Sequence, residues 1–139
     1  MIRFYCAGIP KSMSVGKTVR WQKNGYAKSG SFQKRANTEW ATLLGYVGRQ
    51  HAPVSPLKGA LSFTALFYVP RPASLSKREW APLKRPDIDN LMHKLTDQWN
   101  GIFWNDDSQV IDFVARKRFA LDGRPGVEII VEPVSCVST

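Results

Sequence analysis

Two pairs of aspartates, Asp87 with Asp89 and Asp106 with Asp107, are the residues best suited to chemistry. Close carboxylates repel one another and raise each other's pKa, so a bound divalent cation would relieve the conflict. Magnesium prefers oxygen ligands and keeps several of its waters, so two or three carboxylates suffice to hold it. A metal held in this way activates a water and neutralises charge that builds on phosphoryl oxygens. The pattern therefore predicts a magnesium site for phosphodiester hydrolysis without a covalent nucleophile.

The first pair stands where an extended segment meets a helix. Pro86 favours an extended backbone before it. In extended chain, Asp87 and Asp89 point to one side while Ile88 points towards the core. Asp89 or Asn90 is expected to cap the helix that follows, and its N-terminal N–H groups favour a phosphate. That helix, a turn and a short return would bring the second pair beside the first. Either pair alone is commonly a cap or a turn, so the prediction rests on their combination.

Hydrophobic spacing predicts one α+β domain over residues 1–139, in the order β-α-β-α-β-β, with a mixed sheet covered by two helices. In the second helix, Leu91, Leu95 and Trp99 recur every four residues, which predicts a buried stripe. This helix would carry the first aspartate pair at its start, and the second pair would lie just before a strand. The predicted strands are residues 2–9, 59–69, 109–119 and 126–131, the helices are about 33–50 and 89–99, and the long loops are 11–31 and 71–86.

The charge of the chain favours a polyanionic partner. The net charge is +9, and no acidic residue precedes Glu39. Trp21, Tyr26 and Phe32 are interleaved with the bases of this first segment, a mixture suited to a phosphate backbone and exposed bases. The alternative for this segment is a solvated, partly disordered loop. A second basic group leads into the acidic stretch. The residues predicted to bind DNA are Lys17, Arg20, Lys23, Lys28, Lys34, Arg35, Lys77, Arg78, Lys84 and Arg85.

The composition argues against several other function classes. Cys6 and Cys136 are the only cysteines, and His51 and His93 are the only histidines, so zinc chemistry has almost no ligands. The sequence contains no apolar run of about 18 residues and no start typical of a signal peptide. We therefore expect a cytoplasmic protein with no membrane partner and no small-molecule cofactor.

The acidic stretch resembles the RusA family of Holliday junction resolvases, which are crossover junction endodeoxyribonucleases. The resemblance implies a homodimer, dependent on Mg²⁺ with Mn²⁺ able to substitute, that nicks two opposing strands of a four-way junction in DNA recombination and repair. Members are often encoded by phages or prophages. The family's metal-binding carboxylates fall on Asp87, Asp89 and Asp107, and Asp106 assists or orients its neighbour. The resemblance covers roughly residues 59–132 and rests on Arg85–Leu91, Asp97, Asn100-Gly101 and Asn105–Val110.

One position departs from the family pattern. The family has a catalytic lysine four residues after the second aspartate of Asp-x-Asp, where this chain has His93 followed by Lys94. An ammonium there would stabilise the attacking hydroxide or the phosphorane charge. We favour Lys94, whose long stem would reach round the helix. Otherwise His93 takes the role, and activity would fall as the pH rises past about 6.5, or the role is lost and activity is weak. Asp97 is expected to form a helix ion pair with Lys94.

Three other functions stay open on these residues. A metal nuclease for flaps, forks or single strands would use the same carboxylates, and the products from different branched substrates would separate it from a resolvase. A protein that binds junctions or branched DNA, with weak or no cleavage, would account for the displaced lysine. A basic structural protein of a phage particle would leave the carboxylates unexplained.

Overall fold

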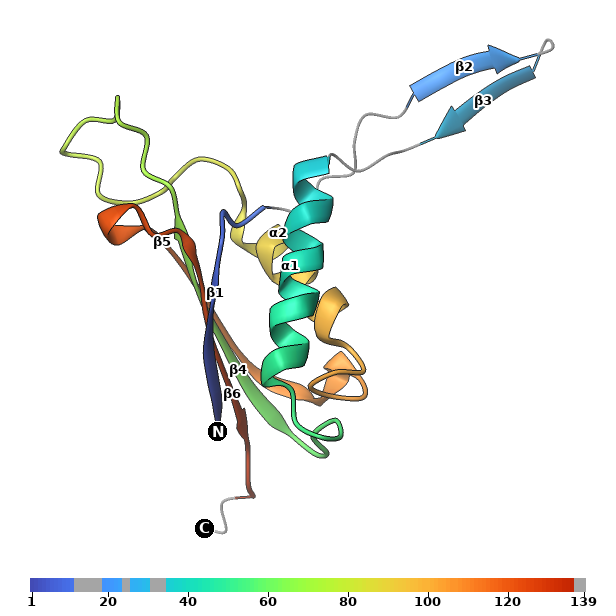
Figure 1. Ribbon diagram of the computed structural model, residues 1–139, viewed down its shortest axis with the longest axis vertical. Helices are drawn as coiled ribbons and strands as arrows, with labels where there is room; N and C mark the ends of the chain where they lie inside the picture. Colours follow the sequence, from blue (N-terminus) through green and yellow to red (C-terminus); the bar gives the residue numbers. More distant parts are fainter. Residues whose placement is uncertain (12–18, 24–25, 31–34, 137–139) are drawn as a thin grey trace.

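The computed structural model describes residues 1–11, 19–23, 26–30 and 35–136, and the side chains between residues 12 and 38 lie outside this description. The main body is a four-stranded sheet in the order β1-β6-β4-β5 with two helices on one face (Figure 1). The predicted α+β class, the mixed sheet and the order β-α-β-α-β-β are confirmed for this sheet and its helices. The elements are β1 (Ile2–Ala7), α1 (Arg35–His51), β4 (Leu61–Val69), α2 (Ile88–Trp99), β5 (Val110–Phe119) and β6 (Gly126–Pro133).

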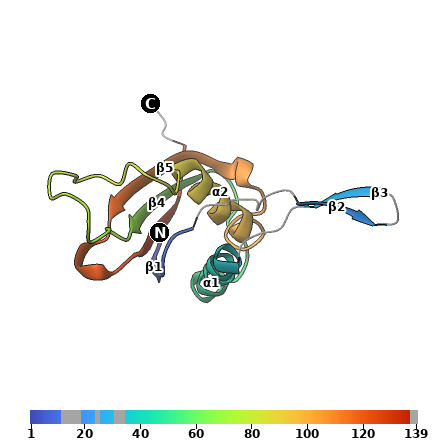
Figure 2. The ribbon, with the colours of Figure 1, turned by 90° about the horizontal axis from the view of Figure 1, so that it is seen from above.

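A hairpin lies between β1 and α1, where the sequence predicted a long loop. β2 (Val19–Lys23) and β3 (Tyr26–Gly30) pair antiparallel and form a separate two-stranded sheet. The dipeptide Asn24-Gly25 between them is a strong hairpin signal in the sequence, and the prediction gave more weight to the abundance of glycine, serine and lysine. Figure 2 shows the hairpin extending away from the sheet and the helices. The basic and aromatic segment is therefore carried on an extended ribbon.

The connection from β4 to β5 decides where the acidic residues lie. β6 pairs antiparallel with β1 and β4, whereas β5 pairs parallel with β4 and therefore needs a crossover, which α2 provides. The chain leaves the end of β4 through the predicted loop, runs back along α2, and starts β5 with Val110 opposite Leu61 at the start of β4. The start of α2 therefore lies near the end of β5, and Asp107 lies at the start of β5.

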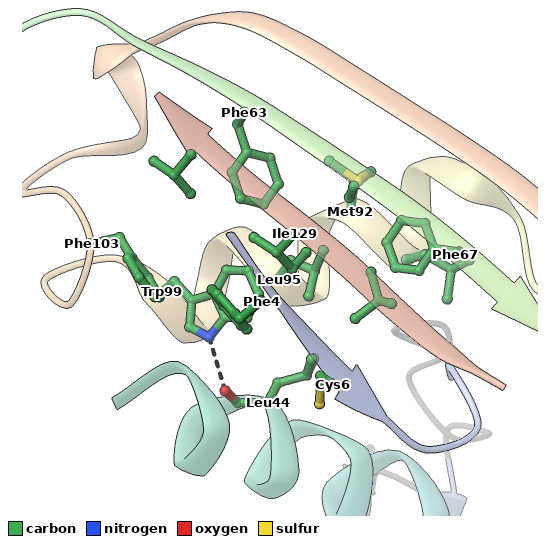
Figure 3. Packing of buried hydrophobic residues seen from close by; sticks show 14 of the residues in the cluster. Phe4, Cys6, Leu44, Phe63, Phe67, Met92, Leu95, Trp99, Phe103 and Ile129 are labelled. Atoms are coloured by element: carbon green, nitrogen blue, oxygen red, sulfur yellow. Dashed lines mark hydrogen bonds between the residues drawn. The ribbon is translucent and has the colours of Figure 1, made fainter. Parts of the chain in front are cut away.

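The core lies between the sheet and the two helices (Figure 3). β4 supplies its centre, because the alternate residues Phe63, Ala65 and Phe67 are fully buried while the residues between them are partly exposed. α2 covers this surface with Leu91 and Leu95, both fully buried. The predicted apolar stripe of α2 is therefore confirmed.

Trp99 joins the end of α2 to α1. Its indole Nε1 donates a hydrogen bond to the carbonyl oxygen of Leu44 at 2.9 Å, and the whole side chain is buried (Figure 3). Gly48 makes this approach possible, because a Cβ at that position would lie 2.3 Å from Trp99 Nε1. Among the described residues, no helix is both long enough and apolar enough to cross a membrane.

Candidate active site

The N-terminus of α2 carries the first aspartate pair. Asp87 is the N-cap, with φ −75° and ψ 143°, and its carbonyl oxygen accepts the first helical hydrogen bond from the Leu91 N–H at 3.1 Å. The prediction of a cap at Asp89 or Asn90 is wrong, because the backbone is extended only as far as Asp87. Asp89 lies in the first helical turn, where a negative charge is favourable. The two exposed carboxylates are therefore not arranged as in an extended strand.

Two adjoining pockets border these residues. Asp87 and Asp89 line one pocket of about 620 Å³, together with the segment Arg116–Arg118 of β5. Asp89 also lines a second pocket of about 420 Å³, whose other walls include His93 and Asp107. Asp89 thus connects the two pockets. The structure brings one aspartate of each predicted pair to a shared pocket, with the histidine between them in the sequence.

The second pair has a division of roles that is visible in its hydrogen bonds. The Asp106 carboxylate accepts a hydrogen bond from the Ser108 N–H at 3.0 Å and caps the short 3-10 helix Asp107–Gln109. This backbone hydrogen bond and a second one with the neighbouring carboxyl of Asp107 lower the pKa of Asp106. Asp106 is therefore engaged in holding the turn, and the turn presents Asp107 to the pocket.

Gln109 is a positioning residue that the sequence analysis missed. Its Oε1 accepts hydrogen bonds from the backbone N–H groups of Asn105 at 2.8 Å and Asp106 at 3.1 Å. Its Nε2 donates to the carbonyl oxygens of Leu57 at 2.9 Å and Gly59 at 3.0 Å. The signal was present, because an aspartate followed three residues later by glutamine is the pattern of a capping box. Gln109 ties the turn before β5 to the segment before β4.

The four predicted metal ligands do not form one cluster in a single chain. Among the described residues, no three acidic, histidine or cysteine side chains lie close enough together to form a metal-binding group. The parallel crossover is the physical reason, because it places Asp87 near the end of β5 and Asp107 at its start. The assignment of Asp87, Asp89, Asp106 and Asp107 to a metal stays a prediction.

His93 and Lys94 occupy contrasting positions on α2. His93 is exposed and borders the pocket of Asp89 and Asp107. Lys94 is 3% exposed, and its Nζ has no hydrogen-bond partner in the described part of the chain. Burial therefore lowers the pKa of Lys94. The ion pair expected between Lys94 and Asp97 is not formed, because Lys94 lies on the buried side of α2 while Asp97 is exposed.

Lys117 anchors the segment that leads to the first aspartate pair. Its Nζ donates hydrogen bonds to the carbonyl oxygens of Lys84 at 3.1 Å and Pro86 at 2.9 Å. The peptide bond between Arg85 and Pro86, inside this anchored segment, is cis. Lys117 lies at the wall of the pocket that Asp87 shares with it. Nothing in the sequence indicated this contact, because it joins segments that only the fold brings together.

The predicted DNA-binding residues fall into two groups. The four on the loop after β4 are exposed, as DNA contact requires: Lys77, Arg78, Lys84 and Arg85. Lys17 and Lys34 lie outside the described residues. The structure places the backbone of Arg20 and Lys23 on β2, of Lys28 on β3 and of Arg35 at the start of α1, without describing their side chains. DNA contact stays a prediction for both groups.

Comparisons with known proteins extend the resemblance towards the N-terminus. The sequence model of a family described as "Endodeoxyribonuclease RusA" matches residues 15–132, which include the hairpin and α1 as well as the acidic stretch. The chain is also similar to the uncharacterized protein YqaN of Bacillus subtilis (strain 168). The two are 33% identical over 99 residues, which cover 64% of this chain and 68% of YqaN.

Proposed function

The chain belongs to the RusA endodeoxyribonuclease family, and from that premise we propose that it is a magnesium-dependent resolvase that nicks two opposing strands of a four-way DNA junction. Family membership implies endodeoxyribonuclease activity on junctions. The observation that carries the finer proposal is the pocket where Asp89 of α2 meets Asp107 before β5. It lies on a chain of net charge +9, which favours the approach of DNA. The protein would act as a homodimer, in the cytoplasm, in recombination and repair.

The side chains at this pocket fit a hard divalent cation. Asp89 and Asp107 are exposed carboxylates on two different elements, and Asp87 borders the adjoining pocket. Magnesium is commonly held by one or two carboxylates, waters and substrate phosphate oxygens, so a protein site need not be a closed cage. We assign Mg²⁺, with Mn²⁺ able to substitute, to these three aspartates, with Asp106 orienting Asp107. When bound, such an ion lowers the pKa of a water and neutralises phosphoryl charge.

The remaining groups bind and orient the phosphodiester. The backbone N–H groups at the start of α2 are directed to favour an anion at the pocket mouth. Arg116 and Arg118 lie at the wall of the same pocket as Asp87 and carry the charge needed to hold a phosphate. His93 is the pocket-lining group at the position of the family lysine, and it donates a proton or a hydrogen bond to phosphate oxygen only in its protonated form.

A second candidate function is a junction-binding protein with weak or no cleavage. One observation favours it: the ammonium of Lys94 is buried and unpaired in the described structure, whereas the exposed residue at the family position is a histidine. A chain that lost the catalytic ammonium would keep its basic surfaces and therefore its affinity for DNA.

Cleavage of synthetic DNA tests both functions. The wild type would be incubated with a labelled four-way junction, a fork, a flap and a linear duplex, with magnesium or with EDTA. The proposed function predicts paired nicks on the junction that EDTA abolishes and that Asp89→Asn reduces at least about a hundredfold. Asp97→Asn is the matched control, because Asp97 is an exposed aspartate of the same helix that borders neither pocket. Tight junction binding without cleavage would favour the second function, and nicks on flaps or forks alone would make it a different nuclease.

A further inference from the structure

β5 is an edge strand with the composition of an interior strand. It pairs with β4 on one side, and no strand pairs with its other side among the described residues. Ile111, Phe113 and Val114 are nevertheless 60%, 46% and 40% exposed. A solvated edge is normally protected by charges, proline or a bulge, and a long apolar edge is a template for pairing with another chain. The first half of β5 therefore lacks a partner.

The exposed apolar residues lie on both faces of the strand. Phe113 stands opposite Phe63 on the face covered by the helices, and the two ring centroids are 5.6 Å apart. Val114 stands opposite Thr64 on the face that carries no helix. Antiparallel sheets that have one solvated face show polar residues on that face, whereas strands covered on all sides are apolar on both. A partner that binds only one face of the sheet would leave half of this surface exposed, so we expect a partner that extends the sheet.

We propose that β5 pairs antiparallel with β5 of a second copy of this chain, about a twofold axis at Val114. The inference rests on the proposed function only in that a junction cut twice needs two sites. It would leave no apolar edge on this side of the sheet. Two four-stranded sheets would become one continuous sheet with the helices of both copies on the same side.

The charges of β5 select this register. A twofold axis perpendicular to the sheet keeps each residue on its own face. With the axis at Val114, Asp112 lies opposite the partner's Arg116, and the same pair forms again on the other side of the axis. Opposite charges at directly facing positions stabilise a sheet, and like charges destabilise it. An axis at Asp112 would place two carboxylates face to face, and an axis at Arg116 would place two guanidinium groups face to face.

The same register also suits the apolar residues. Val114 meets its own counterpart, as expected for a β-branched pair at the centre of the contact. Phe113 lies opposite the partner's Ala115, so a large side chain meets a small one. Phe113 and Ala115 both border the pocket of Asp89 and Asp107. The proposed interface therefore adjoins the candidate active site.

Disulfide trapping tests the register directly. In a Cys136→Ser background, which leaves only the buried Cys6, Val114→Cys would place two thiols at facing positions. Facing Cα atoms in an antiparallel pair are about 4.5–5.5 Å apart, which suits a disulfide. Mild oxidation is therefore expected to link most of the protein into a covalent dimer. Ile111→Cys is the matched control, because it is more exposed but lies roughly 20 Å from its counterpart in this register.

Charge reversal supplies a second, independent test by analytical ultracentrifugation. Asp112→Arg and Arg116→Asp should each raise the dimer dissociation constant at least about tenfold, and the double variant should restore it. A wild-type dimer that Val114→Cys fails to link, or that Ile111→Cys links equally well, would overturn the interface. A wild type that stays monomeric on its own and on the junction would overturn it as well. Junction cleavage by the wild type is scored separately, so a nuclease that dimerises through another surface would refute this inference alone.

Discussion

Replacement of Lys94 by methionine is expected to stabilise the protein. The Lys94 side chain is 3% exposed and its ammonium has no hydrogen-bond partner in the described structure, so the folded state holds a polar group that has lost its water. Methionine has a similar length and no charge, and it fills irregular spaces in a core. An unpaired buried polar group costs about 1–3 kcal/mol, so Lys94→Met should increase the free energy of unfolding by about that amount near neutral pH. For a chain of this size the melting temperature would rise by roughly 3–10 °C.

The same reasoning fixes the sign of a pH dependence. Burial lowers the pKa of Lys94 from its ordinary value of 10.5. Between the lowered pKa and 10.5 the unfolded chain binds more protons than the folded chain, so the free energy of unfolding contributed by this residue rises with pH. The destabilisation is fully present below the folded-state pKa and is relieved as the pH rises. The advantage of Lys94→Met should therefore shrink towards alkaline pH, by at most about 1.4 kcal/mol per pH unit.

Urea denaturation of both proteins at a series of pH values measures these effects. Lys58→Met is the control, because Lys58 is exposed and its replacement should change stability by less than about 0.5 kcal/mol. A Lys94→Met protein that is less stable than the wild type at neutral pH would refute the reasoning, since the ammonium would then have a stabilising partner in solution. Junction cleavage by the same variant separates the two residues: activity is retained if His93 fills the family role, and lost if Lys94 does.

Three further predictions concern packing and the active site. Gly48→Ala should destabilise the protein by roughly 2–4 kcal/mol in urea denaturation, because the added Cβ would lie 2.3 Å from Trp99 Nε1 and break its hydrogen bond to α1. Lys117→Met should raise the magnesium concentration needed for half-maximal cleavage several-fold, because the segment before Asp87 loses two hydrogen bonds, at 3.1 and 2.9 Å. His93→Lys restores the family pattern in the pocket, so junction cleavage should increase and should no longer fall above neutral pH.

Each of these variants has a control or a contrary result. Gly45→Ala places its Cβ 3.5 Å from Gln98 Oε1, an ordinary contact, so it should be neutral or slightly stabilising in the same helix. Arg118→Met removes the same charge as Lys117→Met without touching the carbonyl anchors. An equal shift in magnesium dependence for both would show that charge alone matters. Loss of cleavage in His93→Lys would show that the histidine has a function of its own.

The sequence alone determined the class of chemistry and the main elements. Two aspartate pairs in a strongly basic chain sufficed to predict metal-dependent phosphodiester hydrolysis, because hard cations and phosphates are bound by charge and residue type. The helices and the strands of the main sheet followed from hydrophobic periodicity, which reflects burial of one face in each element. The stripe of Leu91, Leu95 and Trp99 on α2 is confirmed as fully buried for that reason.

Only the tertiary structure decided how the functional residues are distributed. Periodicity does not specify which strand lies next to which, and the parallel pairing of β5 with β4 separates Asp87 from Asp107 along one strand. It also buries Lys94 while exposing His93, a difference of one residue on a helix that depends on which face meets the sheet. Lys117 reaches Pro86 from a distant part of the sequence, and β5 becomes an edge only through the order of strands. These properties arise from contacts between segments, and local sequence carries no record of them.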